Sequence, residues 1–381
     1  MNNSAMATAM PGDLDSTAVA LVAMTATGVQ LALRIRDRLP AAEVYVPVRH
    51  RFALAYGAHG FSRLKQVFPE LWGRYRKIVC IMATGIVVRL SAPLIAGKRE
   101  DPAVVVVDER GRFVISLLSG HLGGANRLAR QVAAVVGGEA VITTASDVEG
   151  RPALDLIARD LGLTPENPAL LARLERAVLE DEPIRVVDPY QLLRPALSGL
   201  EQVLWLDPPP MESGPCCEPA EPVAAGIWVS ERAAPTSGDW LLLRPANLVV
   251  GVGCNRGTEA AEILQLIIQV LNTQGFSPLS IRNLASIDLK ADESGLLEAA
   301  EKLQVPIEFF PREAIATVAV PNPSATVAIH AGVPSVCEAT ALVSARGPNL
   351  LIPKHKSRNA TVAVALADWT SSASAPAPAT I

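Results

Sequence analysis

The chain has 381 residues, which at ~150 residues per domain predicts two or three domains. Its 34 basic and 38 acidic residues give a net charge of −4, so the overall charge provides no electrostatic argument for nucleic-acid binding. Half of the residues are hydrophobic and 19% are charged, which excludes extensive disorder, and no uninterrupted apolar run approaches the ~18 residues of a membrane span.

Residues 1–16 are expected to form a flexible tail. They are not expected to be a signal peptide, because they lack its basic region followed by an apolar core. Strand-like and helix-like runs then alternate through a predicted N-terminal domain, residues 17–148. We expect strands at 18–24, 78–82, 103–107, 113–118 and 141–143, a hairpin turn at 109–112, and helices at 27–39 and 125–136. Gly137 and Gly138 are suited to end the second helix.

Prolines are concentrated in the middle of the chain, where eleven of the 30 fall between Pro183 and Pro245. Proline lacks an amide donor and restricts the residue before it, which disfavours long helices and central strands. Residues 149–247 are therefore predicted to be a variable region, either a small irregular domain or a linker.

The alternation of strands and helices resumes in a predicted C-terminal domain, residues 248–368. We expect strands at 248–252, 307–310, 350–352 and 361–366, and helices at 258–273, 292–303 and 334–344. Residues 369–381, rich in Ser, Ala and Pro, predict a disordered tail. The predicted fold class is α/β, with two domains of mostly parallel sheets flanking the proline-rich middle.

The five cysteines are odd in number and scattered, and the adjacent Cys216 and Cys217 do not have the spacing of a metal-binding CxxC pair. This usage favours a reduced, cytoplasmic protein without a metal of its own. No histidine near Cys254 in the sequence supports a nucleophilic role, so an inert thiol is favoured there.

The densest group of chemistry-bearing residues is the segment 116–126, Ser-Leu-Leu-Ser-Gly-His-Leu-Gly-Gly-Ala-Asn. Its glycines at 120, 123 and 124 permit close backbone approach, and amides at the start of the next helix attract carboxylate or phosphate. His121 adds a group that moves protons near neutral pH. The alternative is a tight turn in which His121 only bonds to the backbone, but open α/β sheets bind ligands at such strand ends, which favours function.

Polar residues follow other predicted strands. Thr84 and Gly85 precede the cations Arg89, Lys98 and Arg99, a set that predicts an anion-binding cradle, although a solvated loop explains Lys98 and Arg99 equally well. Three acidic residues have two interpretations each, proton transfer or a local turn or capping role: Asp108, Glu109 and Asp147. Thr143 and Thr144 lie beside the last of these.

In the C-terminal domain, Gly251, Gly253 and Gly257 have one residue too many for the dinucleotide fingerprint. The ribose-binding acid ~20 residues later is also missing, so an anion-binding turn with Arg256 is favoured. Further polar candidates follow at other element ends: Ser286, Lys290, Glu338 and Lys354. Glu338 is either catalytic or favourable to its helix dipole.

Several of these strings resemble one family. The N-terminal signature of the CbiG family of cobalamin biosynthesis proteins resembles residues 82–89, 92–94, 101–104, 107–109 and 114–126. The C-terminal domain of that family resembles residues 251–254, 285–290 and 336–339. The resemblance covers about residues 17–368 in the family's order. The family more often has Thr where this chain has Ser146.

The resemblance implies a cobalt-precorrin-5A hydrolase of the anaerobic cobalamin pathway. This enzyme opens a δ-lactone on the macrocycle and releases acetaldehyde, giving cobalt-precorrin-5B. The cobalt arrives with the substrate, so no cofactor or metal of the protein's own is expected. The expected partners are the cobalt-corrinoid substrate and, as further candidates, other enzymes of the corrin pathway; neither nucleic acid nor a membrane is expected, and the oligomeric state stays open.

Under this activity His121 is the first candidate for the base, with Asp108, Glu109 or Asp147 orienting or replacing it. The amides of Gly120, Gly123 and Gly124 are candidates for oxyanion stabilisation. The remaining residues are expected to bind the substrate, largely through its carboxylates: Thr84, Gly85, Arg89, Lys98, Arg99, Ser119, Asn126, Arg127, Thr143, Thr144, Gly251, Gly253, Arg256, Ser286, Lys290, Glu338 and Lys354.

Three alternatives stay open. A non-catalytic corrinoid carrier or scaffold would use the same anionic pockets, and a nucleotide-binding oxidoreductase or transferase is disfavoured by the glycine spacing. The third alternative divides the two roles between the domains, so that the N-terminal domain catalyses the reaction and the C-terminal domain binds the substrate.

Overall fold

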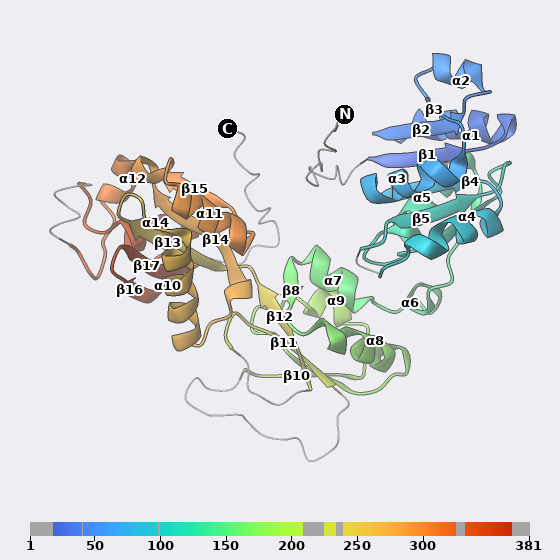
Figure 1. Ribbon diagram of the computed structural model, residues 1–381. Helices are drawn as coiled ribbons and strands as arrows, with labels where there is room; N and C mark the ends of the chain where they lie inside the picture. Colours follow the sequence, from blue (N-terminus) through green and yellow to red (C-terminus); the bar gives the residue numbers. More distant parts are fainter. Residues whose placement is uncertain are drawn as a thin grey trace, which may run out of the picture. The chain divides into compact units, whose positions relative to one another are not determined.

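The computed structural model describes residues 18–39, 41–97, 100–208, 225–233, 239–324 and 332–367 (Figure 1). The chain divides into two compact units, residues 1–156 and 157–381. In the described residues, no helix has both the length and the apolar character required to cross a membrane.

The first unit contains a seven-stranded sheet in the order β3-β2-β1-β4-β5-β6-β7. Its strands are β1 (Val19–Ala23), β2 (Ala42–Pro47), β3 (His59–Phe61), β4 (Lys77–Ile81), β5 (Ala103–Val107), β6 (Phe113–Leu118) and β7 (Glu139–Val141). Strands β1 to β5 are parallel, whereas β6 pairs antiparallel to β5 and β7 runs with β6. The carboxyl ends of β6 and β7 therefore lie at the edge where β1 to β5 begin.

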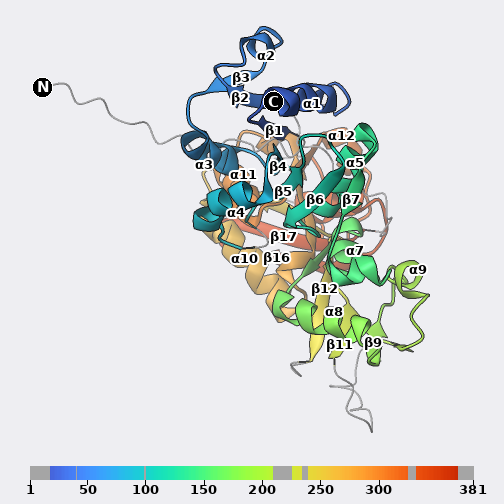
Figure 2. The ribbon, with the colours of Figure 1, turned by 90° about the vertical axis from the view of Figure 1, so that its right-hand side faces the viewer.

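Helices cover both faces of this sheet (Figure 2). Helices α1 (Ala26–Arg36) and α5 (Ala125–Val136) pack on one face, and α3 (Leu64–Arg74) and α4 (Thr84–Ser91) pack on the other. Strand β5 is buried throughout because its alternate valines enter the two layers. The shorter helices are α2 (Arg51–Ala55), η1 (Ala92–Leu94), α6 (Ala145–Val148) and α7 (Leu154–Asp160).

Most predicted elements of this unit are confirmed. The hairpin between β5 and β6 is present, and Gly137 ends α5 with a φ of 73°. The last strand ends at Val141 rather than Thr143. The elements between residues 42 and 74, β2 through α3, were not predicted.

The described residues of the middle region are regular in structure, so the prediction of a small irregular domain or a linker was wrong. They form a five-stranded sheet, ordered β10-β9-β11-β12-β8, in which only β8 is antiparallel to its neighbour. The prolines avoid the strand interiors: Pro183 immediately precedes β9, and Pro245 is the last residue of β12. The prolines from 209 to 222 lie outside the described residues.

The elements of this sheet are short. The strands are β8 (Leu163–Pro165), β9 (Ile184–Val187), β10 (Val203–Leu206), β11 (Ala225–Val229) and β12 (Trp240–Pro245), and the helices are η2 (Pro168–Leu170), α8 (Leu171–Leu179) and α9 (Arg194–Leu197).

The C-terminal part of the second unit has a further five-stranded sheet, ordered β15-β14-β13-β17-β16. Its strands are β13 (Leu248–Cys254), β14 (Ile281–Ile287), β15 (Ile307–Phe310), β16 (Leu350–Lys356) and β17 (Ala360–Leu366). Strands β13, β14 and β15 are parallel, and β17 is antiparallel to both β13 and β16. The carboxyl ends of β13, β14 and β16 therefore share one edge.

Helices cover this sheet on both faces, as predicted for an α/β domain. Helices α10 (Ala260–Thr273) and α11 (Ser294–Leu303) pack on one face, and α12 (Arg312–Ala316) and α14 (Val336–Ala345) pack on the other. Two short turns, η3 (Pro278–Ser280) and η4 (Asp288–Lys290), flank β14. The predicted mostly parallel α/β fold class is confirmed, with three sheets instead of two.

Candidate active site

The loop that carries His121 connects β6 to α5 and is closed by its own backbone. The amides of Ala125 and Asn126 donate to the carbonyls of Ser119 and Gly120, both at 3.0 Å. Only glycine fits at position 123, because a Cβ there would lie 2.4 Å from the Cβ of Ser119. The glycines therefore permit a tight loop that presents His121 at the end of the sheet.

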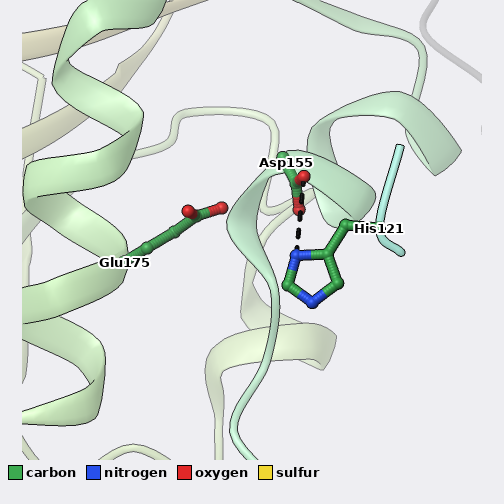
Figure 3. Close-up of side chains that lie close together, drawn as sticks. All are labelled: His121, Asp155 and Glu175. Carbon is green, nitrogen blue, oxygen red and sulfur yellow. Dashed lines mark ion pairs between the residues drawn. The ribbon is translucent and has the colours of Figure 1, made fainter. Parts of the chain in front are cut away.

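The ring of His121 has polar neighbours at both nitrogens. Its Nε2 lies 3.0 Å from the hydroxyl oxygen of Ser146 and 3.3 Å from a carboxylate oxygen of Asp147. Its Nδ1 lies 3.8 Å from a carboxylate oxygen of Asp155, an ion-pair distance (Figure 3, which also draws Glu175 of the second unit). With 19% of its side chain exposed, His121 is held in place yet remains open to a ligand.

Asn126 ties this cluster to the sheet. Its side chain is 95% buried, accepts a hydrogen bond from the Ser116 hydroxyl at 2.6 Å, and donates to Thr144 at 3.1 Å and to Asp147 at 2.7 Å. One amide thus joins β6, α5 and the segment after β7. Sequence reasoning placed Asn126 among the substrate ligands, but its burial and partners indicate a positioning role.

Asp147 is held as a carboxylate. Burial acts to raise its pKa, but the Arg130 guanidinium at 2.5 Å, the Asn126 amide and His121 together hold the pKa of Asp147 below its usual value. A carboxylate with a lowered pKa is a weak base. Asp147 is therefore better suited to orient His121 than to replace it.

Of the three glycine amides predicted to stabilise an oxyanion, two have no protein acceptor in the described residues. In the described part of the chain, the amides of Gly120 and Gly123 donate to no protein acceptor, whereas Gly124 donates to the carbonyl of His121 at 2.8 Å. The predicted oxyanion role is thus left with Gly120 and Gly123. Arg127 is exposed, and a Cβ on Gly124 would lie 4.0 Å from its guanidinium.

Two other predicted residues also lie at this edge. Ser119 donates to the carbonyl of Asp101 at 3.2 Å, which joins the loop to the segment before β5. Thr143 is exposed. The predicted cations Lys98 and Arg99 lie outside the described residues.

The structure does not bring the polar residues after β4 and β5 to His121. Because β6 reverses direction, Thr84, Gly85, Asp108 and Glu109 follow strands that end at the opposite edge of the sheet. The prediction that Asp108 or Glu109 orients or replaces His121 does not fit this arrangement, because the antiparallel β6 places His121 at the other edge. Arg89 is exposed and donates to the carbonyl of Gly85 at 2.8 Å.

Asp108 has a local role in the hairpin. Its carboxylate accepts from the amides of Arg110 at 2.9 Å and Phe113 at 2.6 Å. Burial acts to raise its pKa, but these turn amides hold the pKa of Asp108 below its usual value. Turn formation, the alternative considered from the sequence, explains this residue.

A second candidate site is a cleft of about 590 Å³ in the C-terminal domain, at the carboxyl ends of β13, β14 and β16. Among its described lining residues there are five cations and no carboxylate. The cations are Arg256, Lys290, Lys354, Lys356 and Arg358. Neighbouring acids compensate two of them, since Arg256 pairs with Asp292 at 2.8 Å and Lys290 with Glu293 at 3.3 Å.

Four predicted C-terminal residues line this cleft: Gly253, Arg256, Lys290 and Lys354. Two others lie beneath it. Gly251 lets α14 cross β13 closely, since a Cβ there would lie 1.9 Å from the carbonyl oxygen of Cys337, and Ser286 donates to the carbonyl of Val252 at 2.7 Å. Gly251 and Ser286 therefore have packing roles, instead of the predicted contacts with a ligand.

Glu338 also supports the cleft from below. It is fully buried and accepts hydrogen bonds from the amide of Lys354 at 3.0 Å and from Asn322 at 3.1 and 2.9 Å. Cys254 lines the cleft, and burial raises the pKa of its thiol. A raised pKa keeps the thiol protonated, in keeping with an inert cysteine.

Family models match the chain in order: Cobalamin synthesis G N-terminal at residues 66–147, Cobalamin biosynthesis central region at 152–245, and Cobalamin synthesis G C-terminus at 248–365. A cobalt-precorrin-5A hydrolase of Priestia megaterium is 34% identical over 363 residues, which cover 91% of this chain and 94% of the relative. The chain belongs to the CbiG family. The resemblance seen in the sequence motifs is thereby confirmed.

A second curated relative agrees. A cobalt-precorrin-5A hydrolase of Salmonella typhimurium is 35% identical over 321 residues, 78% of this chain and 83% of the relative. A solved structure of a cobalamin biosynthesis protein G homolog from Sulfolobus solfataricus is 21% identical, covers 93% of this chain and 98% of its own, and has a TM-score of 0.34.

The sequence analysis missed two residues of the His121 cluster as site candidates. Ser146 was placed in the polar cluster of residues 143–147 and noted as a small departure from the family pattern, but it was given no role, and Asp155 was not considered. The serine follows the predicted strand end within the same polar run as Asp147, which was a usable signal. Asp155 is on α7, in the stretch predicted to be irregular, so no sequence pattern placed it near His121.

Proposed function

We propose that this CbiG-family protein is a cobalt-precorrin-5A hydrolase, the activity for which its relatives from Priestia megaterium and Salmonella typhimurium are named. The reaction adds water to a δ-lactone and releases acetaldehyde, giving cobalt-precorrin-5B. The observation that carries the proposal is His121, whose ring meets a hydroxyl and a carboxylate at Nε2 and a second carboxylate at Nδ1.

In this mechanism His121 is the general base. Opening a lactone requires an oxygen nucleophile to lose its proton as it attacks the carbonyl carbon, and an imidazole accepts such a proton near neutral pH. Asp147 and Asp155 lie within 4 Å of the ring nitrogens and stabilise the imidazolium that forms. The partial burial of all three side chains strengthens these interactions relative to water.

The charge that develops on the lactone oxygen needs donors fixed in advance. The amides of Gly120 and Gly123 lie in the same loop as His121 and donate to no described protein group. We assign them to this oxyanion. Arg127, exposed beside the loop, is suited to hold one of the many carboxylates of the substrate.

After the ring opens, the freed hydroxyl loses its proton, and the carbon–carbon bond that joins its carbon to the macrocycle breaks. The electron pair of that bond passes to the conjugated macrocycle, which takes up a proton. The cobalt belongs to the substrate, so this proposal assigns the protein no metal or cofactor of its own.

The cationic cleft of the C-terminal domain is proposed to bind carboxylates of the corrinoid. Lys290, Lys354 and Arg256 reach it from three different elements, and its described lining has no carboxylate to repel an anion. We further propose a cytoplasmic location and contact with other enzymes of the corrin pathway. The described cysteines, Cys80, Cys254 and Cys337, are unpaired thiols, as in a reducing compartment.

The test is acetaldehyde release from purified cobalt-precorrin-5A by the full-length protein. His121→Ala is expected to slow release by about 10²–10⁴-fold, the usual contribution of a general base. His59→Gln is the matched control, because His59 is an exposed histidine of the same unit that pairs with Glu43. Binding without acetaldehyde in the wild type would indicate a carrier, and wild-type release by His121→Ala would contradict the assigned base.

A further inference from the structure

We propose that Ser146 is the nucleophile that opens the lactone, so that the reaction passes through a covalent acyl-enzyme with His121 as the base. This inference rests on the proposed hydrolase function and adds a catalytic residue to it. A directly attacking water molecule, the simpler alternative, needs no serine.

The first argument is the contact between the two side chains. The Oγ of Ser146 lies 3.0 Å from Nε2 of His121, within the reach expected for a nucleophile and its base. In the described residues, this is the only side-chain hydrogen bond of Ser146. Its hydroxyl is thus directed to the imidazole and is half-buried, which leaves it accessible to a ligand.

The second argument is that the position of Ser146 is fixed on both sides. Thr144, two residues before it, and Asp147, the next residue, both accept hydrogen bonds from the buried amide of Asn126. The Arg130 guanidinium holds the other carboxylate oxygen of Asp147 at 2.5 Å. A nucleophile gains reactivity when its neighbours hold it in one geometry, because little order remains to be imposed during attack.

The third argument concerns the far side of the ring. To accept the serine proton at Nε2, the imidazole must carry its own proton on Nδ1, which faces Asp155 at 3.8 Å. Serine, histidine and acid then stand in the order used by hydrolases that cleave esters. The contact to Asp155 is longer than a hydrogen bond, as often holds before substrate binds, and it shortens as the ring becomes charged.

Asp147 does not displace Ser146 as the partner of Nε2. Asn126 and Arg130 already donate to its two carboxylate oxygens, so its negative charge is largely satisfied. It stays 3.3 Å from Nε2 and stabilises the imidazolium electrostatically. As a carboxylate, Asp147 accepts hydrogen bonds and has no proton to give, so the hydroxyl of Ser146 is the group beside Nε2 that supplies one.

The substrate class fits a serine nucleophile because a lactone is an ester. Oγ attacks the lactone carbonyl carbon while its proton passes to Nε2, and the amides of Gly120 and Gly123 receive the oxyanion. The bond from that carbon to the ring oxygen then breaks. His121 returns the proton to the leaving oxygen, and the acid side chain of the substrate is left esterified to Ser146.

Water completes the balance. The two-carbon unit that bears the freed hydroxyl departs as acetaldehyde when the bond from its carbon to the macrocycle breaks, as described above. A water molecule then gives a proton to His121 and attacks the ester carbon, which releases the carboxylate and restores the serine hydroxyl. One water is consumed, and no oxidant or reductant is required.

The experiment compares Ser146→Ala, Ser146→Thr and the wild type in acetaldehyde release from cobalt-precorrin-5A, with rapid acid quenching and mass spectrometry of the peptide containing residue 146. Ser62→Ala, at an exposed serine of the same unit, is the matched control. We expect a loss on the order of 10³-fold or more for Ser146→Ala, activity within about tenfold for the threonine that keeps the hydroxyl, and a corrinoid ester on the quenched wild-type peptide.

Two outcomes would overturn the assignment. A Ser146→Ala protein within tenfold of the wild-type rate means that water attacks directly. A large loss without an ester at any quench time, under saturating substrate, makes Ser146 a positioning residue for His121. Failure of the proposed function is a separate result, because the wild type itself would then release no acetaldehyde.

Discussion

The side chain of Asn126 offers a sharp test of how the site is held together. Replacing it with alanine removes the group that joins Ser116 on β6 to Thr144 and Asp147 beyond β7. All three partners lie around a side chain that is only 5% exposed, so water cannot simply take its place without entering the packed edge of the sheet. We expect both local stability and activity to fall.

The magnitude follows from the bonds that are lost. Two of them join neutral groups, at about 1 kcal/mol each, and one joins the charged Asp147, at about 1.5–3 kcal/mol. Their sum is about 3.5–5 kcal/mol, and a water that enters the cavity recovers part of it, which leaves a loss of about 3 kcal/mol in local stability. Because about 1.4 kcal/mol corresponds to a factor of ten, local opening becomes more than about 100-fold more frequent.

Hydrogen exchange measured by mass spectrometry checks this value locally, in the peptides that cover α5 and residues 139–148. Exchange in these peptides is expected to accelerate about 100-fold in Asn126→Ala, and acetaldehyde release to fall by a similar factor because Ser146 and Asp147 lose their fixed positions. Asn272→Ala, on the exposed face of α10, is the matched control. Exchange within threefold of the wild type in both variants would refute the role given to the Asn126 network.

Three further predictions concern the C-terminal cleft, the crossing of α14 and β13, and the contact between Arg130 and Asp147. The double variant Lys290→Gln/Lys354→Gln should raise KM about tenfold or more with kcat nearly unchanged; an unchanged KM would contradict corrinoid binding in the cleft. Gly251→Ala, which forces a Cβ against the backbone of α14, should cost about 3 kcal/mol in the free energy of unfolding of the second unit, seen as faster exchange there, and wild-type exchange would contradict the close crossing. Arg130→Met should let the pKa of Asp147 rise. A lowered carboxyl pKa stabilises the fold fully above the ordinary value of 3.8, so the loss in unfolding free energy should be complete at pH 7 and should shrink as the pH falls below that value. A loss that does not depend on pH would contradict this prediction.

The fold was predictable wherever hydrophobic periodicity was strong. The all-apolar run of β5 and the helix of residues 260–273 were both expected, because a doubly covered strand and an amphipathic helix leave clear patterns. The middle sheet was missed because a high proline content was taken to exclude strands. In the described part of this sheet, Pro183 and Pro245 lie at strand ends, where they remove no central ladder bond.

The candidate site was only partly predictable. His121 and Asp147 were found because glycines and polar residues cluster after predicted strands. The partners Ser146 and Asp155 were missed because a serine and an aspartate have many common roles, and only tertiary structure places them on opposite sides of one imidazole. Likewise, the roles of Gly251 and Glu338 depend on α14, whose packing against β13 no local pattern reveals.

The direction of β6 and β7 explains why the site lies where it does. In an all-parallel sheet, every strand would end at one edge, and Thr84, Asp108 and His121 would be neighbours. The hairpin after β5 reverses the chain, so the His121 loop and the Ser146 segment end at the edge where the other five strands begin. The rule that sites form at the carboxyl ends of parallel strands then applies to β6 and β7 alone. These two parallel neighbours bring their carboxyl ends together, and each supplies one half of the proposed serine–histidine pair. A substitution that only perturbs the turn at Asp108 should therefore affect catalysis through the register of β6, not through any contact with the substrate.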